Sequence, residues 1–385
     1  MSEHTIISLK IIIIDFVALY GKIKKNLGVG SKMGKQKTIR DVAELAGVSV
    51  ATASRVLNDT DYPVRQHLKQ RVRDAAEKLN YSPNAVARSL RQDTCKDIGL
   101  IVPNISNPFY LQAIHGIEDA LRTSDYNIIL CNTMHDPGRE KAFLKQLYER
   151  QVKGVILSSV CEVNADIVQM HSKRGMKFVL LDQMLAGVET MCINFDSRAG
   201  SRMATEYLIQ QGHQKIAFAT TPMIRWTRKE MYKGYQDALL TAGIPLDDTL
   251  IFEHSQNQAM TSEGDELNIG RTIADSFIRR GCPATAILCV NDMVAIGCIQ
   301  ALDRHGIHVP VDVSVVGFDD IPFAEAYLPA LTTIHYPAQE IGRLAAIMLV
   351  DSIQNNTPKQ SLAMNLTPRL VIRDTVSPIR KTHIF

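Results

Sequence analysis

The 385-residue chain lacks most of the short signatures that mark enzymes and metal-binding proteins. It contains no P-loop, no Gly-rich dinucleotide fingerprint, no internal repeat and no low-complexity tract. Its seven cysteines, spread from position 95 to position 298, form no CxxC pair and no Cys/His ligand spacing. Such a set is typical of reduced core cysteines in a cytoplasmic protein. We therefore expect no cofactor, no metal site and a cytoplasmic location.

A membrane-spanning segment is also missing, although residues 5–20 are apolar enough to raise the question. Lys10 and Asp15 interrupt this run, which is shorter than the roughly 20 residues that a bilayer requires. No small-residue cleavage site follows, so a signal peptide is disfavoured as well. Because the sequence becomes orderly only after Met33, we interpret residues 1–34 as a weakly ordered tail or as the product of a start site assigned too early.

What the chain does contain is a globular composition with an uneven distribution of charge. It is 45% hydrophobic and 22% charged, and its length predicts two or three domains. The net charge of +3 hides an excess of five basic residues in 35–92 and an excess of five acidic residues in 93–385. A basic head on an acidic body indicates a polyanion-binding module joined to a second function.

The head, residues 35–80, contains the pattern of a helix-turn-helix. Apolar residues recur at helical spacing from Thr38, a capping residue, to Gly47, where glycine takes a positive φ cheaply. Ser49 can cap a second helix that buries Ala53, Val56 and Leu57 and exposes Val50, Ala51, Ser54 and Arg55. Such a helix can enter the major groove of DNA. An ordinary helical hairpin is the alternative interpretation of these residues alone.

Two further helical segments follow. Residues 64–79 are amphipathic and predict a third helix that closes a small core. Residues 81–96 form a hinge and linker in which Pro83 and Asn84 start a short helix that ends at Leu90. A helix this short is unstable alone in water, so it should form only against a partner. With Arg88 and Arg91 beside it, DNA is the expected partner.

From Asp97 onward, short apolar runs alternate with helical stretches. The runs predicted as strands are residues 98–103, 127–131, 154–158, 177–182, 215–220, 284–290 and 313–318. Strand-helix alternation predicts parallel sheets covered on both faces, with ligands at the carboxyl ends of the strands. The number of runs is sufficient for two such sheets.

An ordered set of motifs between Thr38 and Thr375 resembles the lactose/galactose repressor (LacI/GalR) family of bacterial transcription regulators. The motifs are TIRDVAELAGVS in the head, YSPNAVARSL in the hinge, and SNPFY, GH, ND, VPVDVSVVGFDD and PALTTIH in the body. The family is not an enzyme family. The resemblance implies a body like a periplasmic sugar-binding protein, with two α/β lobes joined by three crossovers and a ligand between them.

The same resemblance assigns DNA contacts. The matching positions are Thr38, Ser49, Val50, Ala51, Ser54, Arg55 and Asn58 in the head and Asn84, Ala87, Arg88 and Leu90 in the hinge. Val50 and Ala51 would select the operator through apolar contacts, and Arg55 would bind guanine through its guanidinium fork. Leu90 would act as a wedge in the minor groove, with packing on the body as the alternative.

The resemblance also assigns a ligand site and the extent of each lobe. The matching positions are Asn107, Phe109, Tyr110, Asp182, Arg225, Thr227, Asp292 and Asp319. We expect an N-lobe from residues 97–183 and 309–337, a C-lobe from residues 184–308 and 338–375, and a tail at 376–385. Asp292 could accept paired sugar hydroxyls, or it could be a buried carboxylate held only for structure.

One departure from the family lies at residues 225–234. The family usually places an arginine three residues before Gly234, where this chain has Met231, while the loop supplies Arg225, Arg228, Lys229 and the only tryptophan, Trp226. Our hypothesis is an anionic effector, such as a sugar acid or phosphosugar, held by Arg225 with Trp226 stacked on its apolar face. A solvated basic loop is the alternative interpretation.

The implied function is a sequence-specific DNA-binding regulator, expected to be a repressor, controlled by a sugar or sugar acid. A ligand between the lobes would change the spacing of two hinges in a homodimer, which would bind a palindromic operator. The residues after Arg373 contain no leucine heptad, so a tetramer is not indicated. A sugar-binding transport or chemoreception protein is the alternative, but it would need no basic head. An enzyme is disfavoured because His115, His213 and His335 match no catalytic arrangement.

Overall fold

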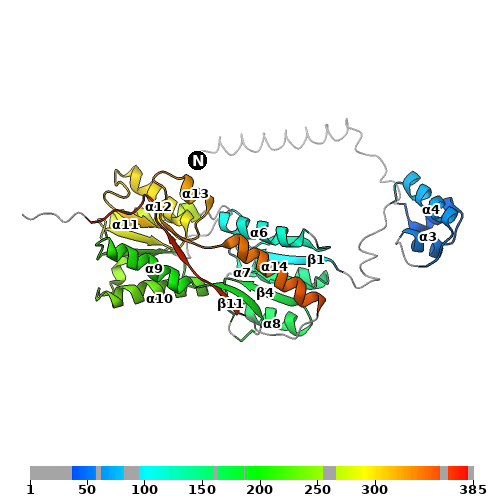
Figure 1. Ribbon diagram of the computed structural model, residues 1–385, viewed down its shortest axis with the longest axis horizontal. Coiled ribbons are helices and arrows are strands. Elements are labelled where there is room, and N and C mark those ends of the chain that lie inside the picture. The colour runs from blue at the N-terminus through cyan, green and yellow to red at the C-terminus, as the bar shows by residue number, and fades with distance from the viewer. Residues whose placement is uncertain are drawn as a thin grey trace, which may run out of the picture. The chain divides into compact units, whose positions relative to one another are not determined.

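The computed structural model describes residues 37–57, 62–81, 95–122, 124–158, 164–185, 187–188, 190–254, 266–355 and 363–379 (Figure 1). The chain divides into two compact units, one ending at Thr94 and the other beginning at Cys95. The predictions for residues 1–34, for Asn58, and for Asn84, Ala87, Arg88 and Leu90 lie outside the described residues.

The first unit contains the predicted helix-turn-helix, formed by α2 (Ile39–Ala46) and α3 (Val50–Leu57). The Asp41 carboxylate accepts hydrogen bonds from the backbone nitrogen and Oγ1 of Thr38, at 2.6 and 3.0 Å, which fixes the beginning of α2. Gly47 ends α2 with a φ of 61°, the left-handed conformation that the sequence predicts for the turn.

Ser49 caps α3, because its Oγ accepts a hydrogen bond of 3.1 Å from the backbone nitrogen of Thr52. The third helix, α4 (Gln66–Lys78), lies within the predicted segment and packs against the other two. The buried residues of this small core are Val42, Ala43, Ala46, Ala53, Val56, Val72, Ala75 and Ala76. Small side chains dominate it, which lets three short helices approach closely.

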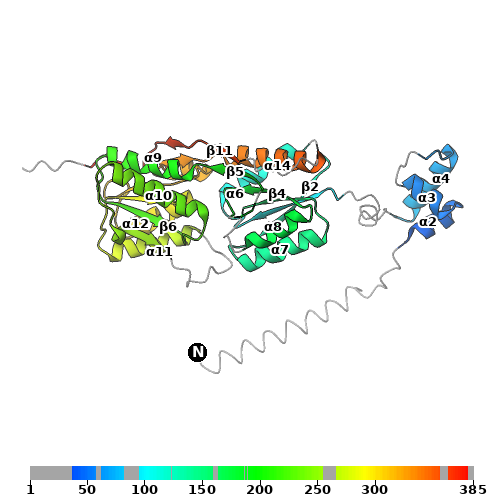
Figure 2. The ribbon, with the colours of Figure 1, turned by 90° about the horizontal axis from the view of Figure 1, so that it is seen from below.

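The second unit contains the two predicted parallel sheets. The N-lobe sheet has the order β11-β5-β4-β3-β1-β2. Its strands are β1 (Asp97–Val102), β2 (Asn127–Asn132), β3 (Gly154–Leu157), β4 (Lys177–Leu181), β5 (Met191–Phe195) and β11 (Ala363–Leu366). One face is covered by the paired helices α6 (Pro108–Leu121) and α14 (Ala338–Gln354), and the other by α7 (Pro137–Glu149) and α8 (Ala165–Lys173) (Figure 2).

The C-lobe repeats this plan with the strand order β7-β6-β8-β9. Its strands are β6 (Ile216–Thr220), β7 (Ile251–Glu253), β8 (Ala286–Cys289) and β9 (Ser314–Val316). Its helices are α9 (Ser197–Gln210) and α10 (Trp226–Thr241) on one face, α11 (Glu266–Arg279) and α12 (Asp292–Arg304) on the other, and the short α13 (Pro322–Ala326). The antiparallel strands β10 (Thr333–His335) and β12 (Arg369–Val371) lie where the chain passes between the lobes.

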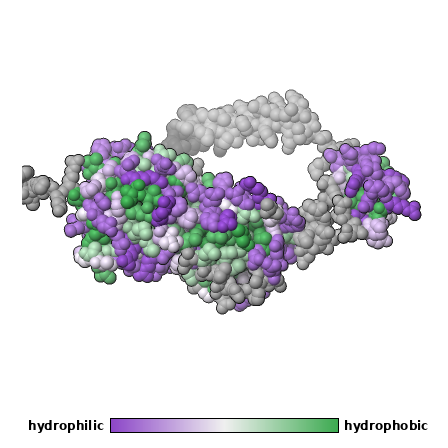
Figure 3. All heavy atoms as spheres, viewed as in Figure 1, coloured by the Kyte–Doolittle hydropathy of each residue, from purple (hydrophilic) through white to green (hydrophobic). Residues whose placement is uncertain are grey.

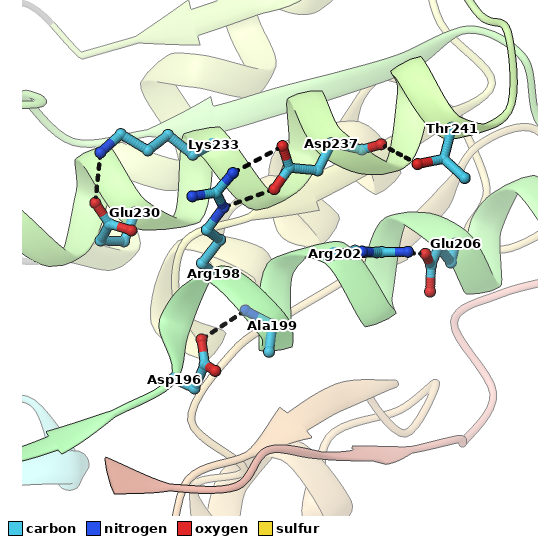
Figure 4. Close-up of polar contacts among 9 residues, drawn as sticks. All are labelled: Asp196, Arg198, Ala199, Arg202, Glu206, Glu230, Lys233, Asp237 and Thr241. Atoms are coloured by element: carbon cyan, nitrogen blue, oxygen red, sulfur yellow. Dashed lines mark hydrogen bonds and ion pairs between the residues drawn. The ribbon is translucent and has the colours of Figure 1, made fainter.

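Glycine residues allow the backbones of the paired helices to come into direct contact. A Cβ on Gly116 of α6 would lie 1.8 Å from the carbonyl oxygen of Gln339 of α14. In the C-lobe, a Cβ on Gly234 of α10 would lie 2.1 Å from the carbonyl oxygen of Arg198 of α9. Beside this crossing, the Arg198 guanidinium donates two hydrogen bonds to Asp237, at 2.6 and 3.0 Å (Figure 4). Any side chain at these glycines would force the helices apart.

The structure corrects the predicted extent of each lobe. Strand β5, expected in the C-lobe, pairs with β4 and therefore belongs to the N-lobe. Strand β9, expected in the N-lobe, pairs with β8 of the C-lobe, and α14 packs on strands β3 to β5 of the N-lobe. The prediction was wrong because neither the apolar runs nor the motifs reveal which sheet a strand joins, which depends on pairing between distant segments. The chain crosses between the lobes after β5, after β10 and after β11.

The seven predicted strands are all present, and the fold class is confirmed. Residues 376–379, predicted as part of a tail, pack on the C-lobe: the Ile379 nitrogen donates to the Gln211 carbonyl at 2.9 Å, and Ser377 Oγ donates to the Pro310 carbonyl at 2.8 Å. Among the described residues, no helix is long and apolar enough to cross a lipid bilayer.

Candidate DNA-binding surface and interlobe ligand site

The outer face of α3 carries the side chains that the sequence assigns to DNA. Val50, Ala51 and Arg55 are exposed, and Ser54 is half-buried. Thr38 and Ser49 lie at the beginnings of α2 and α3, where both already hold helix ends through their hydroxyls. An exposed apolar pair beside an arginine suits the major groove, where thymine methyl groups and guanine acceptors are read.

One neighbour of this surface was not anticipated from the sequence. The Arg55 guanidinium carbon lies 3.9 Å from the centre of the Tyr62 ring, a distance that allows a cation–π contact. Tyr62 lies five positions beyond the end of α3 in the sequence, where an isolated tyrosine gives no signal for such a contact.

In the second unit, polar side chains gather where the parallel strands of both lobes end. Several of these positions adopt a positive φ without being glycine: Met134 and His135 after β2, Asp182 after β4, and Asp319 and Asp320 after β9. Backbone strain of this kind concentrates at functional sites. We call the side chains that meet here the interlobe cluster: Asn107, Tyr110, His135, Asp182, Arg225, Arg228, Glu266, Asp319 and Tyr336.

Two direct hydrogen bonds join the lobes across this cluster. Asn107, the N-cap of α6, donates from Nδ2 to Oε2 of Glu266 in α11 at 2.5 Å. Arg225, the N-cap of α10, donates from Nη2 to the hydroxyl of Tyr110 at 3.5 Å. Tyr110 also lies 3.5 Å from Ser158 Oγ at the end of β3. The predicted residues Asn107, Tyr110 and Arg225 are therefore brought together by contacts between the lobes.

Burial changes the ionisation of the cluster. It raises the pKa of Asp182, and the nearby Arg225 guanidinium opposes that shift. It also raises the pKa of Glu266 and, well above its usual value, the pKa of Asp319. Burial, together with the charges of Arg225 and Arg228, lowers the pKa of His135 to about 4. Perturbed groups concentrated in one place indicate a functional site.

Many polar atoms of this region are buried without a hydrogen-bond partner in the part of the chain that the structure describes. They are His135 Nε2, Asp182 Oδ1, Arg225 Nε, Thr227 Oγ1, Asn291 Nδ2 and the Tyr336 hydroxyl. Each unpaired buried donor or acceptor costs roughly 1–3 kcal/mol, so a polar ligand that satisfied several of them would bind strongly. The arrangement is that of a site prepared for a hydroxyl-rich or charged small molecule.

Two predicted ligand residues have other contacts. Asp292 accepts hydrogen bonds from Thr333 Oγ1 at 2.5 Å and from the Ile321 nitrogen at 2.9 Å. Burial raises its pKa to about 7, although both hydrogen bonds act in the opposite direction. These contacts favour the structural role weighed for Asp292 above. Phe109 packs edge-on against Tyr110 and Tyr336, with ring centres 5.0 and 4.7 Å apart, and so supplies an apolar wall.

The sequence did not identify His135, Glu266 and Tyr336 as members of the site. His135 follows a predicted strand, so the rule that ligands lie at the carboxyl ends of parallel strands could have suggested it. Glu266 and Tyr336 carried no such signal, because only the packing of the two lobes brings them to the cluster. In the part of the chain that the structure describes, no group of three or more His, Cys, Asp or Glu residues could hold a metal ion.

Comparison with known proteins agrees with this division of sites. Residues 38–84 match the family model for bacterial regulatory proteins of the lacI family, and residues 95–372 match that for periplasmic binding proteins and the sugar-binding domain of the LacI family. The transcriptional repressor PurR of Photobacterium profundum is 32% identical over 345 residues, which cover 89% of this chain and 99% of PurR.

Solved structures give the same result. A lac repressor dimer bound to operator and an anti-inducer is 26% identical, with a TM-score of 0.73 over 89% of this chain and 100% of that one. A complex of the regulator CelR with cellobiose is 27% identical, with a TM-score of 0.65 over 88% of this chain and 99% of that one. These similar proteins are regulators and not enzymes, in agreement with the sequence. The chain therefore belongs to the LacI family of bacterial DNA-binding transcriptional regulators.

Proposed function

We propose that this protein is a repressor whose affinity for a palindromic operator is controlled by a sugar or sugar acid bound at the interlobe cluster. The observation that carries the ligand site is the set of buried polar atoms without partners among the described residues, which includes Arg225 Nε and Thr227 Oγ1. Cellobiose in the CelR complex supports a carbohydrate-like ligand. Because the target is DNA, we expect the protein to act in the cytoplasm.

On the DNA side, we propose that α3 enters the major groove. Val50 and Ala51 contact bases, Arg55 binds guanine, and Thr38, Ser49, Ser54 and Asn58 contact the backbone. Hinge residues Asn84, Ala87, Arg88 and Leu90 contact the minor groove. The exposure of Val50, Ala51 and Arg55 on one face of α3 supports this proposal.

A homodimer is the state that a palindromic operator requires, and the C-lobe has an apolar surface suited to it. A groove of about 250 Å³ is lined by Leu267, Met293, Ile296, Gln300, Phe323, Ala326 and Tyr327. Phe323 is 56% exposed beside it, and Figure 3 shows hydrophobic residues gathered on this side of the C-lobe. We propose that a second copy covers this surface. Phe323→Asp should shift sedimentation toward monomer, and Leu240→Asp, at an exposed leucine on α10, should not.

Ligand control follows from the contacts between the lobes. The bonds Asn107–Glu266 and Tyr110–Arg225 hold one relation of the lobes in the described structure. A ligand that binds among these residues stabilises whichever relation it fits better. The hinges of a dimer would then change their spacing, and operator affinity would change by the same coupling free energy.

The test starts from the full-length protein and a library of random duplexes. Selection should enrich an inverted repeat that binds about 10³-fold or more tightly than random DNA at the same salt concentration. Addition of the effector should then change this affinity by about 5–150-fold. A lack of preference for any inverted repeat would show that the DNA assignment is wrong. A preference that no sugar or sugar acid alters would contradict the assignment of the ligand.

A further inference from the structure

Two guanidinium groups of the interlobe cluster lack a carboxylate partner. Arg225 is only 8% exposed, and its hydrogen bond goes to the neutral hydroxyl of Tyr110. Arg228 is half-buried and donates to Thr221 Oγ1 at 3.2 Å and to Met231 Sδ at 3.4 Å. Within the described residues, neither arginine forms an ion pair. Asp182, Glu266 and Asp319 lie near enough to act on the two guanidinium groups, but none of them forms a direct ion pair with either arginine. A desolvated cation without a direct ion-pair partner is costly, so we infer that this charge serves a binding partner.

The beginning of α10 adds further donors at the same place. Arg225 is the N-cap of this 16-residue helix and makes no side-chain capping hydrogen bond, so the first amides of α10 have no cap. Thr227, in the first turn, is 1% exposed, and its Oγ1 has no partner. Arg225 Nε is also unpartnered, although the side chain reaches Tyr110 of the N-lobe. Helix amides, a hydroxyl and two guanidinium groups form a strong anion site.

The opposite side of the cluster suits hydroxyl groups. Asp182 Oδ1 and the Tyr336 hydroxyl are buried and lie close enough for each group to shift the pKa of the other, and neither atom has a further hydrogen-bond partner among the described residues. Burial raises the pKa of Asp182 and of Asp319, so the environment favours the neutral form of both groups more than water does. A carboxyl or phenol group can accept a hydrogen bond from a ligand hydroxyl or donate one to it. The interlobe cluster therefore has a cationic end, at Arg225 and Arg228, and a hydrogen-bonding end, at Asp182 and Tyr336.

We propose that the ligand is a polyhydroxylated carboxylate, a sugar acid, whose carboxylate binds at the beginning of α10 between Arg225 and Arg228. This inference rests on the proposed function and narrows its ligand class. The hydroxyl groups of the ligand point toward Asp182 and Tyr336. A neutral sugar would fill the hydrogen-bonding end but leave both guanidinium groups without a direct ion-pair partner.

In residues 225–234, Arg228 compensates for the arginine that is missing at position 231. Residue 231, where the family usually has a cleft arginine, is a methionine that is 1% exposed in the core. Arg228 lies one turn earlier on α10, and its Nη1 donates to Met231 Sδ. The positive charge is thus retained on the same side of the helix and is joined by that of Arg225. Trp226 is half-buried, and its predicted stacking on the ligand remains a prediction.

The first experiment compares ligands that differ only in charge. Calorimetry on the full-length protein would use glucuronate with glucose, galacturonate with galactose, and gluconate with glucitol, all at equal ionic strength. We expect at least one acid to bind ten-fold or more tightly than its neutral partner. If neutral sugars bind and no acid binds more tightly, this inference is overturned and the proposed function stands. If neither the acids nor the neutral sugars bind, these compounds are excluded as ligands, which contradicts both this inference and the proposed function for them.

The second experiment does not depend on the identity of the ligand. It uses citrate as an anion probe and records the Tm of the wild type, Arg225→Met and Arg228→Met in citrate and in sodium chloride of equal ionic strength. Citrate should raise the Tm of the wild type by several degrees, and each variant should lose most of that rise. Without citrate, the variants should be as stable as the wild type or more stable, because an unpaired buried charge has been removed.

Two further variants complete this experiment. Arg202→Met, on the exposed face of α9, removes a guanidinium that is paired with Glu206 at 2.6 Å and should leave the response to citrate unchanged. Arg225→Lys retains the charge and should recover part of the response if Arg225→Met folds poorly. A citrate response that is the same in the wild type and both methionine variants would refute the anion site. A large loss of Tm in both variants without citrate would instead assign the arginines a structural role.

Discussion

The side chains on the outer face of α3 and those of the interlobe cluster differ in their exposure to solvent. On α3, Val50, Ala51 and Arg55 are exposed, and the ends of the two head helices are satisfied by Ser49 and by the turn at Gly47. In the interlobe cluster, most side chains are buried, and many of their polar atoms have no partner. DNA presents a large charged surface that exposed side chains can reach, whereas a small ligand must be surrounded. In the head, the residues that bind a partner are therefore different from those that stabilise the fold, whereas in the body the same buried residues affect both stability and binding.

The largest loss of stability is expected at the crossing of α9 and α10, where the packing leaves no space for a side chain. Gly234→Ala would place a Cβ 2.1 Å from a backbone oxygen of α9 and should destabilise the second unit by about 3 kcal/mol. Calorimetry should show a lower Tm for the body with the transition of the head unchanged. Gly138→Ala, where the nearest atom is the Asp136 side chain at 3.1 Å, is the control and should change little. An equal loss at both glycines would contradict the close packing of α9 and α10.

The head should show the reverse behaviour, in which binding is lost without loss of stability. Arg55→Ala should weaken binding to the selected operator by about 10–100-fold, because the proposed guanine contact would be lost. Since Arg55 is exposed and its contact with Tyr62 lies at the surface, amide hydrogen exchange in α2 and α3 should change little. Arg55→Lys should recover only part of the affinity, because an ammonium lacks the bidentate fork. An unfolded head in Arg55→Ala would remove the distinction between the two regions.

The coupling in the body predicts a dependence on pH. Because the pKa of His135 is about 4 in the folded protein and about 6.5 in the unfolded chain, the unfolded chain binds more protons between these values. The free energy of unfolding should therefore fall by about 2 kcal/mol between pH 7 and pH 5 through this residue. His135→Asn should reduce that fall, as measured by urea denaturation. A bound anion should raise the pKa of His135 because it offsets the charges of Arg225 and Arg228.

The smallest effect tests the capped head. Ser49→Ala removes the hydrogen bond to the Thr52 nitrogen and should destabilise the head by about 1 kcal/mol. Hydrogen exchange should accelerate in α3 and stay unchanged in the body. Ser49→Asp retains a capping oxygen and is the matched control. A loss of operator affinity greater than this destabilisation would support the proposed contact of the hydroxyl with the DNA backbone, and an equal loss would limit Ser49 to its role as a helix cap.

The sequence was most informative where function depends on neighbouring residues. The capping of α3 by Ser49, the turn at Gly47 and the outward position of Arg55 all follow from a few adjacent side chains. It was less informative about Asp292, whose motif suggested a ligand contact but whose carboxylate bonds to Thr333 and Ile321. A motif identifies a residue, but it does not show whether its side chain hydrogen-bonds to a ligand or to other residues of the protein.

By itself, the sequence determined the three-helix head, the seven predicted strands and the basic character of the head, since periodicity and charge are local properties of the chain. Only the tertiary structure decided which lobe each strand joins and which polar groups meet between the lobes. Sheet membership depends on pairing between distant segments, as between β11 and β5. The same reason applies to Arg225, Asp182 and Glu266, because Arg225 acts on the pKa of both distant carboxylates only after the two lobes have folded.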